Sequence, residues 1–349
     1  MSPFGGHGLA LPGADDERMS RLRSDSARAV QFSRFGDVDV LEIADIARPQ
    51  PGPGEVLVEV LAAGVNHMEA FIRRGMFDSD HSAAFPMRQG TDFSGIVVGL
   101  GEGVSDLKLR SDVVGHALVG SHATHIVVPR ENLVAKPASV SWEVGGALFL
   151  AGVTAWRAIE ATHIGPDDTV VVSAAAGGVG SMEIQLAKLR GATVLGTCGE
   201  RNFDYLRQIG VKPIVYGDGI ADRIRAAAPN GVTVFLDNFG GDNAALAEEL
   251  GIEPARFHSS DDRKEIELRA VWPDAETARR DTEILGELVA LVRDQKLRVL
   301  VSGFYPYGFV QDAFDDLEKR HSRGKIVLGM NPVDAGRVTK ARDIHEAGA

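Results

Sequence analysis

The sequence predicts an α/β protein with two domains, one compact and rich in β-strands, the other built on a doubly wound parallel sheet. The first observation is length, because 349 residues exceed the roughly 100–200 that one domain usually holds. The second is a set of short β-rich runs between Gly and Pro clusters over residues 28–150. The third is the alternation of strand-like and helix-like segments from residue 151 onward.

Composition and charge exclude several classes of partner. Hydrophobic residues make up 44% and charged residues 25%, which is ordinary for a globular protein with sizeable cores. A net charge of −12 repels nucleic acid and anionic membranes, so we expect neither as a partner. The one cysteine, Cys198, excludes an intrachain disulfide and a four-thiolate zinc site. Apolar runs are too short to span a bilayer and the N-terminus lacks a secretory pattern, so we expect a cytoplasmic protein.

The first part of the chain reads as a tail followed by strands. Residues 1–27 predict a flexible tail, because Gly, Pro, Ser and mixed charges dominate and no apolar period occurs. Five runs rich in β-branched residues follow, and the Gly and Pro clusters between them predict turns. We expect strands near residues 27–32, 40–46, 55–65, 93–101 and 124–129.

The second part alternates strands with helices. The continuous apolar run at 169–173 is typical of a strand buried on both faces. We expect further strands at 193–197, 213–216, 233–237, 299–301 and 325–328. We expect helices at 179–190, 203–209, 220–228, 275–294 and 310–320. Such alternation predicts a parallel, doubly wound sheet.

A glycine-rich loop, residues 174–180, lies between the first of these strands and the first helix. In the Rossmann dinucleotide fingerprint, small residues let the backbone approach a pyrophosphate that rests on the helix N-terminus. Ala175 stands where the first glycine usually does, and Gly177 and Gly180 fill the other two places. The context favours a cofactor site over a turn that serves packing alone. The predicted contacts in the loop are Ala176, Gly177, Gly178, Val179 and Gly180.

The end of the second strand indicates which nucleotide binds. NAD sites carry an acid there for the ribose hydroxyl, but this strand ends in Thr197 and Cys198, which we predict to contact the cofactor. Arg201 follows and favours a 2′-phosphate, although it could also be a solvated cation. Glu200 argues against NADP(H), because it lies at about the distance from the glycine loop at which NAD sites carry their acid, but we expect its side chain to face solvent. The sequence therefore predicts NADP(H), with Arg201 on the 2′-phosphate.

Together with this loop, several segments resemble the medium-chain dehydrogenase/reductase superfamily, in its zinc-independent NADPH:quinone oxidoreductase branch. The resemblance extends over about residues 28–330, and the order and spacing of the segments are more specific than any one of them. The matching segments are 51–59, 62–66, 90–95, 150–156, 237–241 and 323–328.

The resemblance implies a split architecture and a homodimer. A GroES-like β-rich catalytic domain would comprise 28–150 and 303–349, and a Rossmann dinucleotide-binding domain 151–302, with the active site between them. It also implies NADP(H) and a small-molecule carbonyl, enone or quinone substrate. The residues that it places at the cofactor are Asn66 on the nicotinamide side, Thr154 near the cofactor, Tyr216 at the adenosine end, Asn238 and Phe239 at the nicotinamide ribose, and Lys325 on the cofactor's side of the cleft.

Zinc-dependent relatives of this superfamily differ at the ligand positions. They carry a cysteine where Asn66 stands, a histidine in the segment that reads Gly90-Thr91-Asp92 here, and a cysteine-rich lobe that this chain lacks. The histidines His122 and His125 are three apart on a strand-like segment, so they would point to opposite faces. We therefore predict no metal.

The proton donor is less clearly indicated. Many relatives carry a tyrosine where Phe71 stands, and phenylalanine cannot donate a proton. Asn66 is the first candidate for a catalytic role, and His67 and Tyr305 are the candidate proton donors, with Tyr307 nearby, although we favour solvent. Two alternatives to quinone or enone reduction stay open: a dehydrogenase acting on C=O, and an NADP(H)-binding sensor or structural protein with little turnover.

Overall fold

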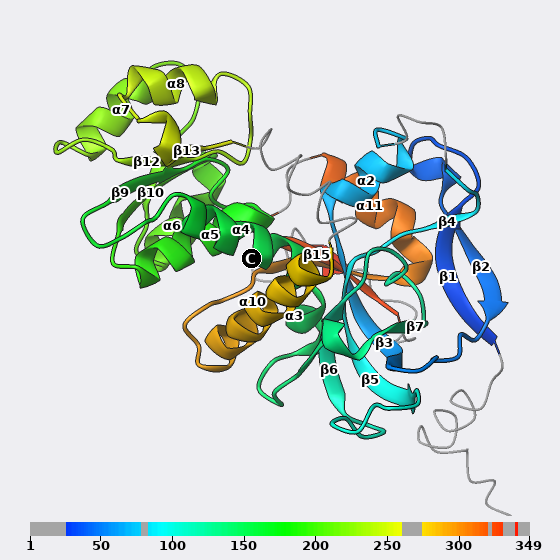
Figure 1. Ribbon diagram of the computed structural model, residues 1–349. Coiled ribbons are helices and arrows are strands. Elements are labelled where there is room, and N and C mark those ends of the chain that lie inside the picture. Colours follow the sequence, from blue (N-terminus) through cyan, green and yellow to red (C-terminus); the bar gives the residue numbers. More distant parts are fainter. Residues whose placement is uncertain (1–25, 78–82, 260–273, 320–322, 331–338, 341–349) are drawn as a thin grey trace, which may run out of the picture.

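The computed structural model describes residues 26–77, 83–259, 274–319, 323–330 and 339–340. Figure 1 shows a β-rich unit, drawn mostly in blue and cyan, beside an α/β unit in green and yellow. Orange and red segments from the end of the chain return to the β-rich unit. The predicted fold class, a β-rich domain with a doubly wound parallel-sheet domain, is confirmed.

The β-rich unit is organised around β3 (Glu55–Val65). β3 pairs antiparallel with β5 (Asp92–Leu100), β7 (His125–Pro129) and β15 (Lys325–Gly329). Both faces of β3 are covered, so Leu57 on one face and Val56 and Val58 on the other are all buried. The remaining strands of this sheet are β6 (Asp112–His116), β8 (Leu133–Ala135), β14 (Val301–Pro306) and β16 (Thr339–Lys340). A second, three-stranded sheet comprises β1 (Ser26–Phe32), β2 (Glu42–Ala47) and β4 (Met87–Arg88).

The α/β unit contains five parallel strands in the order β11-β10-β9-β12-β13. The central β9 (Thr169–Val172) is buried on both faces, as its continuous valine run predicts. The other strands are β10 (Thr193–Cys198), β11 (Lys212–Val215), β12 (Val234–Leu236) and β13 (Phe257–His258). The helices of this unit are α4 (Phe149–Ala161), α5 (Gly178–Leu189), α6 (Phe203–Gln208), α7 (Ile220–Ala227), α8 (Asn243–Glu249) and α10 (Ala275–Arg293).

Among the described residues, three further helices belong to the β-rich unit. They are α2 (His67–Arg73), α3 (Trp142–Gly146) and α11 (Val310–Glu318). α11 packs against α2, β3, β14 and β15, and so places the end of the chain beside the end of β3. Among the helices of the described residues, none combines the length and the apolar character needed to cross a membrane.

The structure differs from the predicted elements in a few places. β14 begins at Val301 rather than 299, and β1 begins at Ser26, inside the predicted tail; residues 1–25 and 341–349 lie outside the described residues. Neither α2 nor α4 is among the helices expected from the sequence; most residues of α4 are buried, so its apolar period is weak. The predicted domain boundaries at 150/151 and 302/303 fall within α4 and β14.

Candidate active site

The glycine loop joins the carboxyl end of β9 to the amino end of α5. α5 begins at Gly178 and its N-cap is Gly177, which provides no side chain to the N–H groups of the first turn. Those N–H groups and the positive end of the helix dipole favour a bound anion. The loop predicted from the sequence therefore lies where a dinucleotide pyrophosphate would rest.

The backbone of this loop also fits such a ligand. A Cβ at Gly180 would lie 2.6 Å from the carbonyl oxygen of Ala174, so only glycine permits this turn. Ala174 itself has a φ of 45°, in the region that favours glycine. A Cβ at Gly177 would lie 3.1 Å from the same oxygen. Because the turn is this tight, the first residues of α5 present backbone rather than side chains to a ligand.

The carboxyl end of β12 lies next to the glycine loop. Asn238 donates from Nδ2 to the carbonyl oxygen of Ser173 at 3.1 Å and to Oε2 of Glu183 at 2.5 Å. Its Oδ1 is buried and has no hydrogen-bond partner among the described residues. Because an unpaired buried acceptor is costly, this oxygen fits a donor from a ligand, such as a ribose hydroxyl. Phe239, which follows, is 61% exposed and leaves its ring available to a ligand.

The carboxyl end of β10 has no acid. Thr197 and Cys198 are buried there, and burial raises the pKa of the Cys198 thiol to about 11, so the thiol is neutral. Glu200 follows in the short helix η3 (Glu200–Asn202) and is exposed, as expected. Arg201 is also exposed, beside it. The strand end therefore places a neutral side chain where NAD sites carry a carboxylate.

A second arginine, which the sequence analysis did not single out, reaches η3 from the end of the chain. Arg323 donates from Nη2 to the carbonyl oxygen of Arg201 at 3.0 Å and from Nε to Oδ1 of Asn202 at 2.9 Å. Tyr216, directly after β11, is 64% exposed, and its hydroxyl lies 3.5 Å from the position of a Cβ on Gly199. Two cations and an aromatic ring thus surround the end of β10.

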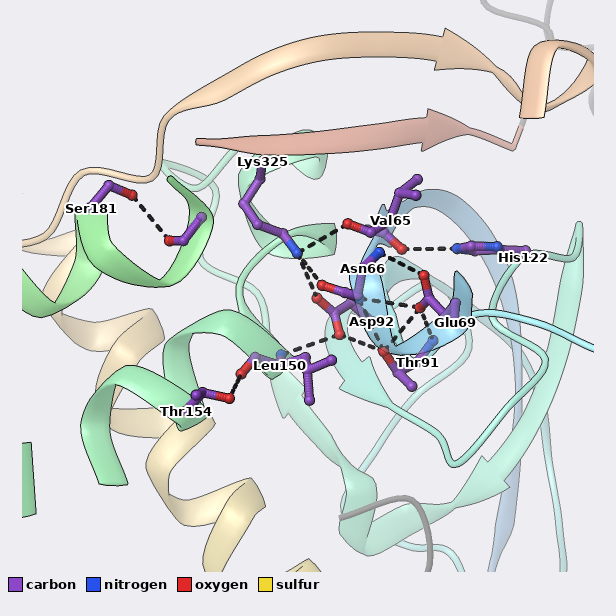
Figure 2. Close-up of polar contacts among 12 residues, drawn as sticks. Val65, Asn66, Glu69, Thr91, Asp92, His122, Leu150, Thr154, Ser181 and Lys325 are labelled. Atoms are coloured by element: carbon purple, nitrogen blue, oxygen red, sulfur yellow. Dashed lines mark hydrogen bonds and ion pairs between the residues drawn. The ribbon is translucent and has the colours of Figure 1, made fainter. Parts of the chain in front are cut away.

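A closed set of polar contacts forms at the end of three neighbouring strands. We call it the polar ring, and its members are Asn66, Glu69, Thr91, Asp92 and Lys325 (Figure 2). The end of β3 lies beside the starts of β5 and β15, because both strands are antiparallel to β3. This pairing brings together residues as distant in sequence as Asn66 and Lys325.

Asn66 occupies the centre of the polar ring. Its backbone N–H donates to Oε2 of Glu69 at 2.6 Å, which is half of a helix capping box. Its Nδ2 donates to Oε1 of Glu69 at 3.2 Å and to the hydroxyl of Thr91 at 3.3 Å. The ammonium of Lys325 donates to its Oδ1. The Thr91 hydroxyl lies 2.9 Å from Oδ1 of Asp92, and Oδ2 of Asp92 lies 3.9 Å from the ammonium, which closes the ring.

The polar ring holds two carboxyl groups and one ammonium, all of them buried. Burial, and then the neighbouring Asp92, raise the pKa of the Glu69 carboxyl to about 7, whereas Asn66 and Lys325 act in the opposite direction. Asp92 also accepts from the backbone N–H of Leu150 at 3.2 Å, at the amino end of α4. The ring therefore depends on the ammonium for charge balance.

Lys325 connects the polar ring to the glycine loop. The backbone N–H of Gly324 donates to the carbonyl oxygen of Ala176 at 2.8 Å, and Gly324 forms a parallel bridge with Gly177. A Cβ at Gly178 would lie 3.1 Å from Cδ of Lys325. The stem of Lys325 thus packs on the loop that faces a pyrophosphate, and its ammonium contacts Asn66.

The predicted proton donors are placed differently from one another. His67 is the first residue of α2, exposed and next to Asn66. Tyr305 is fully buried in β14 with its hydroxyl hydrogen-bonded to Asp316, a placement that favours a structural contact. Tyr307 accepts a hydrogen bond from Nη1 of Arg28 at 3.1 Å. Roles for these residues stay predictions, and His67 is the one beside Asn66.

Thr154 and the missed residues complete the site. The hydroxyl of Thr154 donates to the carbonyl oxygen of Leu150 at 2.7 Å, and this turn of α4 is held to Asp92 in the ring (Figure 2). Sequence reasoning missed Glu69 as a partner of Asn66, although Asn-x-x-Glu is a recognisable capping-box signature. Asp92 and Arg323 offered no comparable signal.

The positions of the zinc ligands in zinc-dependent relatives fall in the polar ring. Asn66 and Thr91 stand there, and the Lys325 ammonium contacts Asn66. Within the described ranges, no three His, Cys, Asp or Glu side chains are grouped so that they could hold a metal ion. The predicted zinc independence stays a prediction.

Two family models match the chain. The model described as "Alcohol dehydrogenase GroES-like domain" matches residues 52–138, and the model described as "Zinc-binding dehydrogenase" matches residues 209–328. The first falls within the β-rich unit and the second covers the end of the α/β unit with β14 and β15.

Individual relatives agree with these matches. The chain is 28% identical to a "Quinone-oxidoreductase homolog, chloroplastic" of Spinacia oleracea, over 86% of this chain and 97% of that protein. It is 26% identical to a "Synaptic vesicle membrane protein VAT-1 homolog" of Homo sapiens, over 87% of each chain. The solved quinone oxidoreductase from Coxiella burnetii superposes with a TM-score of 0.75 at 26% identity, over 88% of this chain and all of that chain. With the fold and the glycine loop, these similarities show that the chain belongs to the medium-chain dehydrogenase/reductase superfamily of oxidoreductases.

Proposed function

We propose that the chain is a zinc-independent, NADPH-dependent oxidoreductase that transfers hydride to a quinone, a conjugated enone or enal, or a similar small carbonyl compound. The observation that carries the proposal is the direct contact between the glycine loop and the polar ring through Gly324 and Lys325. The contact supports the proposal because it joins the glycine loop, where we propose the pyrophosphate binds, to Asn66, which we propose for the nicotinamide side. The spinach relative, a quinone-oxidoreductase homolog, and the Coxiella quinone oxidoreductase support a quinone substrate.

NADPH is favoured over NADH by the charges at the end of β10. Cys198 is neutral there, and Arg201 and Arg323 both reach this strand end. Guanidinium groups bind phosphate oxygens through charge-assisted hydrogen bonds, and no acid stands at the strand end for a ribose hydroxyl. Tyr216 is exposed beside them and could pack on the adenine.

The protein's part in the reaction is to bind and orient the nucleotide and the substrate and to stabilise the charge that develops. Hydride donation is the chemistry that NADPH supplies when bound. The first turn of α5 would hold the pyrophosphate, and Asn238 Oδ1 would accept from the nicotinamide ribose. Asn66 would orient the nicotinamide, with Lys325 behind it. Solvent protonates the product, with His67 as the side chain exposed beside Asn66.

Nucleotide titration tests this proposal. We expect NADPH to bind the wild-type chain at least about tenfold more tightly than NADH, since a 2′-phosphate gains charge-assisted hydrogen bonds. Arg201→Ala and Arg323→Ala should each weaken NADPH by about tenfold and leave NADH unchanged. Arg207→Ala is the matched control, because this arginine is exposed on α6 and pairs with Asp204. Fluorescence of the bound nicotinamide is the measurement.

Three outcomes would contradict parts of the proposal. Tighter binding of NADH would reverse the assignment at β10 and give Glu200 the role of the ribose acid. Binding of neither nucleotide would indicate that the glycine loop is only a turn and not a cofactor site. Tight NADPH binding without oxidation over a broad panel of quinones and enones would favour the sensor alternative. The homodimer and the cytoplasmic location stay predictions.

A further inference from the structure

The contacts around Asn66 settle which way its side-chain amide points. The nitrogen Nδ2 faces Oε1 of Glu69 and the Thr91 hydroxyl, and both can accept. The oxygen Oδ1 faces the ammonium of Lys325, which can only donate. A reversed amide would set its NH₂ group against the ammonium and its oxygen against a carboxylate. The partners therefore leave one orientation.

These contacts also determine what Asn66 can still offer to a ligand. Both hydrogens of Nδ2 are used within the ring, one on Glu69 and one on Thr91. The backbone N–H is used as well, on Oε2 of Glu69. A carbonyl oxygen has two lone pairs, and the ammonium engages one of them. The one capacity that remains is a lone pair on Oδ1, so Asn66 can accept a hydrogen bond but cannot donate one.

The direction of Oδ1 follows from Lys325. The stem of this lysine packs against Gly178, and the preceding Gly324 is hydrogen-bonded to Ala176 of the glycine loop. Oδ1 points toward that lysine, whereas Nδ2 points toward Glu69 and Thr91, where α2 and β5 begin (Figure 2). The free lone pair is thus on the side of Asn66 that faces the proposed nucleotide site.

We propose that Glu69, Thr91 and Lys325 are positioning residues that fix the Asn66 amide with Oδ1 toward the nucleotide, so that Asn66 serves as an acceptor for a donor on the nicotinamide riboside. The fitting donor is the carboxamide NH₂ of the nicotinamide, because the ribose of that half is already assigned to Asn238 Oδ1. The inference rests on the proposed function, because it needs a nicotinamide nucleotide on the glycine loop. It adds which atom of Asn66 makes the contact and which side chains hold that atom in place.

Glu69 and Thr91 offer isosteric substitutions that test the ring. Glu69→Gln keeps the shape but leaves one acceptor oxygen for the two donors of Asn66, its N–H and its Nδ2. Thr91→Val removes the hydroxyl that accepts from Nδ2, and Thr91→Ser keeps it. Thr91→Ser is therefore the matched control, since it retains the hydrogen bond and loses only a methyl group.

The probes are NADPH and 2′-phospho-ADP-ribose, which lacks the nicotinamide. We expect Glu69→Gln and Thr91→Val to weaken NADPH by about tenfold, the worth of one hydrogen bond, and to leave 2′-phospho-ADP-ribose within about twofold. Thr91→Ser should bind NADPH within about twofold of wild type. In turnover with 1,4-benzoquinone, the two weakened variants should lose kcat while their KM for the quinone is unchanged.

Two results would overturn the inference, and a third would overturn the proposed function on which it rests. Unchanged NADPH affinity in both Glu69→Gln and Thr91→Val overturns the inference, as does equal weakening of the two probes, which would indicate general damage to the fold. Thermal melting of each apoprotein separates a loss of stability from a loss of contact. If the wild-type chain binds neither 2′-phospho-ADP-ribose nor NADPH, the proposed function itself fails. That result differs from failure of the inference, in which wild type binds NADPH and the variants bind it equally well.

Discussion

Gly180→Ala is expected to weaken NADPH binding by about 100-fold, which corresponds to about 2.7 kcal/mol. The new Cβ would lie 2.6 Å from the carbonyl oxygen of Ala174 and 3.0 Å from Cα of Ala175. Both are backbone atoms, so no side chain can move aside, and the glycine loop itself must shift away from the phosphate position. Fluorescence titration with NADPH is the measurement.

The matched control for this substitution is Gly286→Ala. Gly286 lies within α10, and a Cβ there meets no atom within 4 Å. The same added methyl should leave NADPH affinity unchanged and raise the free energy of unfolding by about 0.5–1 kcal/mol, because alanine is the better helix residue. Undiminished affinity in Gly180→Ala would show that the loop does not hold the nucleotide.

Lys325→Met is expected to lower the free energy of unfolding by about 3–5 kcal/mol at pH 8. The ammonium is buried among Oδ1 of Asn66, the carbonyl oxygen of Val65 and Oδ2 of Asp92. Its removal leaves two buried carboxyl groups in the polar ring without a cation, and such uncompensated charge is costly. Urea unfolding of the variant and of wild type is the measurement.

The pH dependence of the difference in free energy of unfolding between Lys325→Met and wild type shows whether the buried carboxyl groups cause it. The pKa of Glu69 is already raised to about 7 from 4.5, and Lys325 acts to lower it, so removing the ammonium raises it further. A carboxyl group whose pKa is higher in the folded state than in the unfolded chain lowers the free energy of unfolding when it is ionised. This loss of stability grows as the pH rises from about 4.5 through the folded pKa. The loss in Lys325→Met should therefore shrink between pH 8 and pH 5.

An exposed lysine provides the comparison. Lys319→Met removes the ammonium of a side chain that is 63% exposed; this ammonium lies 3.6 Å from Oδ1 of Asp316. Its effect on the free energy of unfolding should stay within about 0.5 kcal/mol, with little pH dependence, because solvent screens such pairs. A loss in Lys325→Met that is equally small, or independent of pH, would contradict the charge balance assigned to the polar ring.

The sequence predicted best where one physical requirement determines the residue pattern. A strand covered on both faces needs a continuous apolar run, and the run predicted at 169–173 contains the central β9, Thr169–Val172. A tight strand-to-helix turn needs glycine, and Gly180 is found where a Cβ cannot fit. The lack of an acid at the last residue of β10 was also readable, because Cys198 stands at the end of this strand in the sequence.

The features that the sequence did not predict depend on contacts between segments that are distant in the chain. Asn66, Asp92 and Lys325 meet because β3, β5 and β15 are neighbours, and no local pattern encodes that pairing. Tyr305 was indicated by its place in the chain, whereas its burial and its bond to Asp316 depend on packing with α11. α4 was missed because a helix that is buried on most sides loses the amphipathic period that marks surface helices.

Transfer of a deuterium label tests the central claim most directly. The protein would be incubated with 2-cyclohexenone and NADPH deuterated at either face of nicotinamide C4, and the product analysed by mass spectrometry. We expect deuterium from one face only, bound to the β-carbon of cyclohexanone, because hydride moves directly between nucleotide and substrate held in one geometry. Label on the carbinol carbon of 2-cyclohexenol would assign the protein to C=O reduction instead. Product without carbon-bound deuterium from either face, or no product from the enone and from 1,4-benzoquinone alike, would contradict the account.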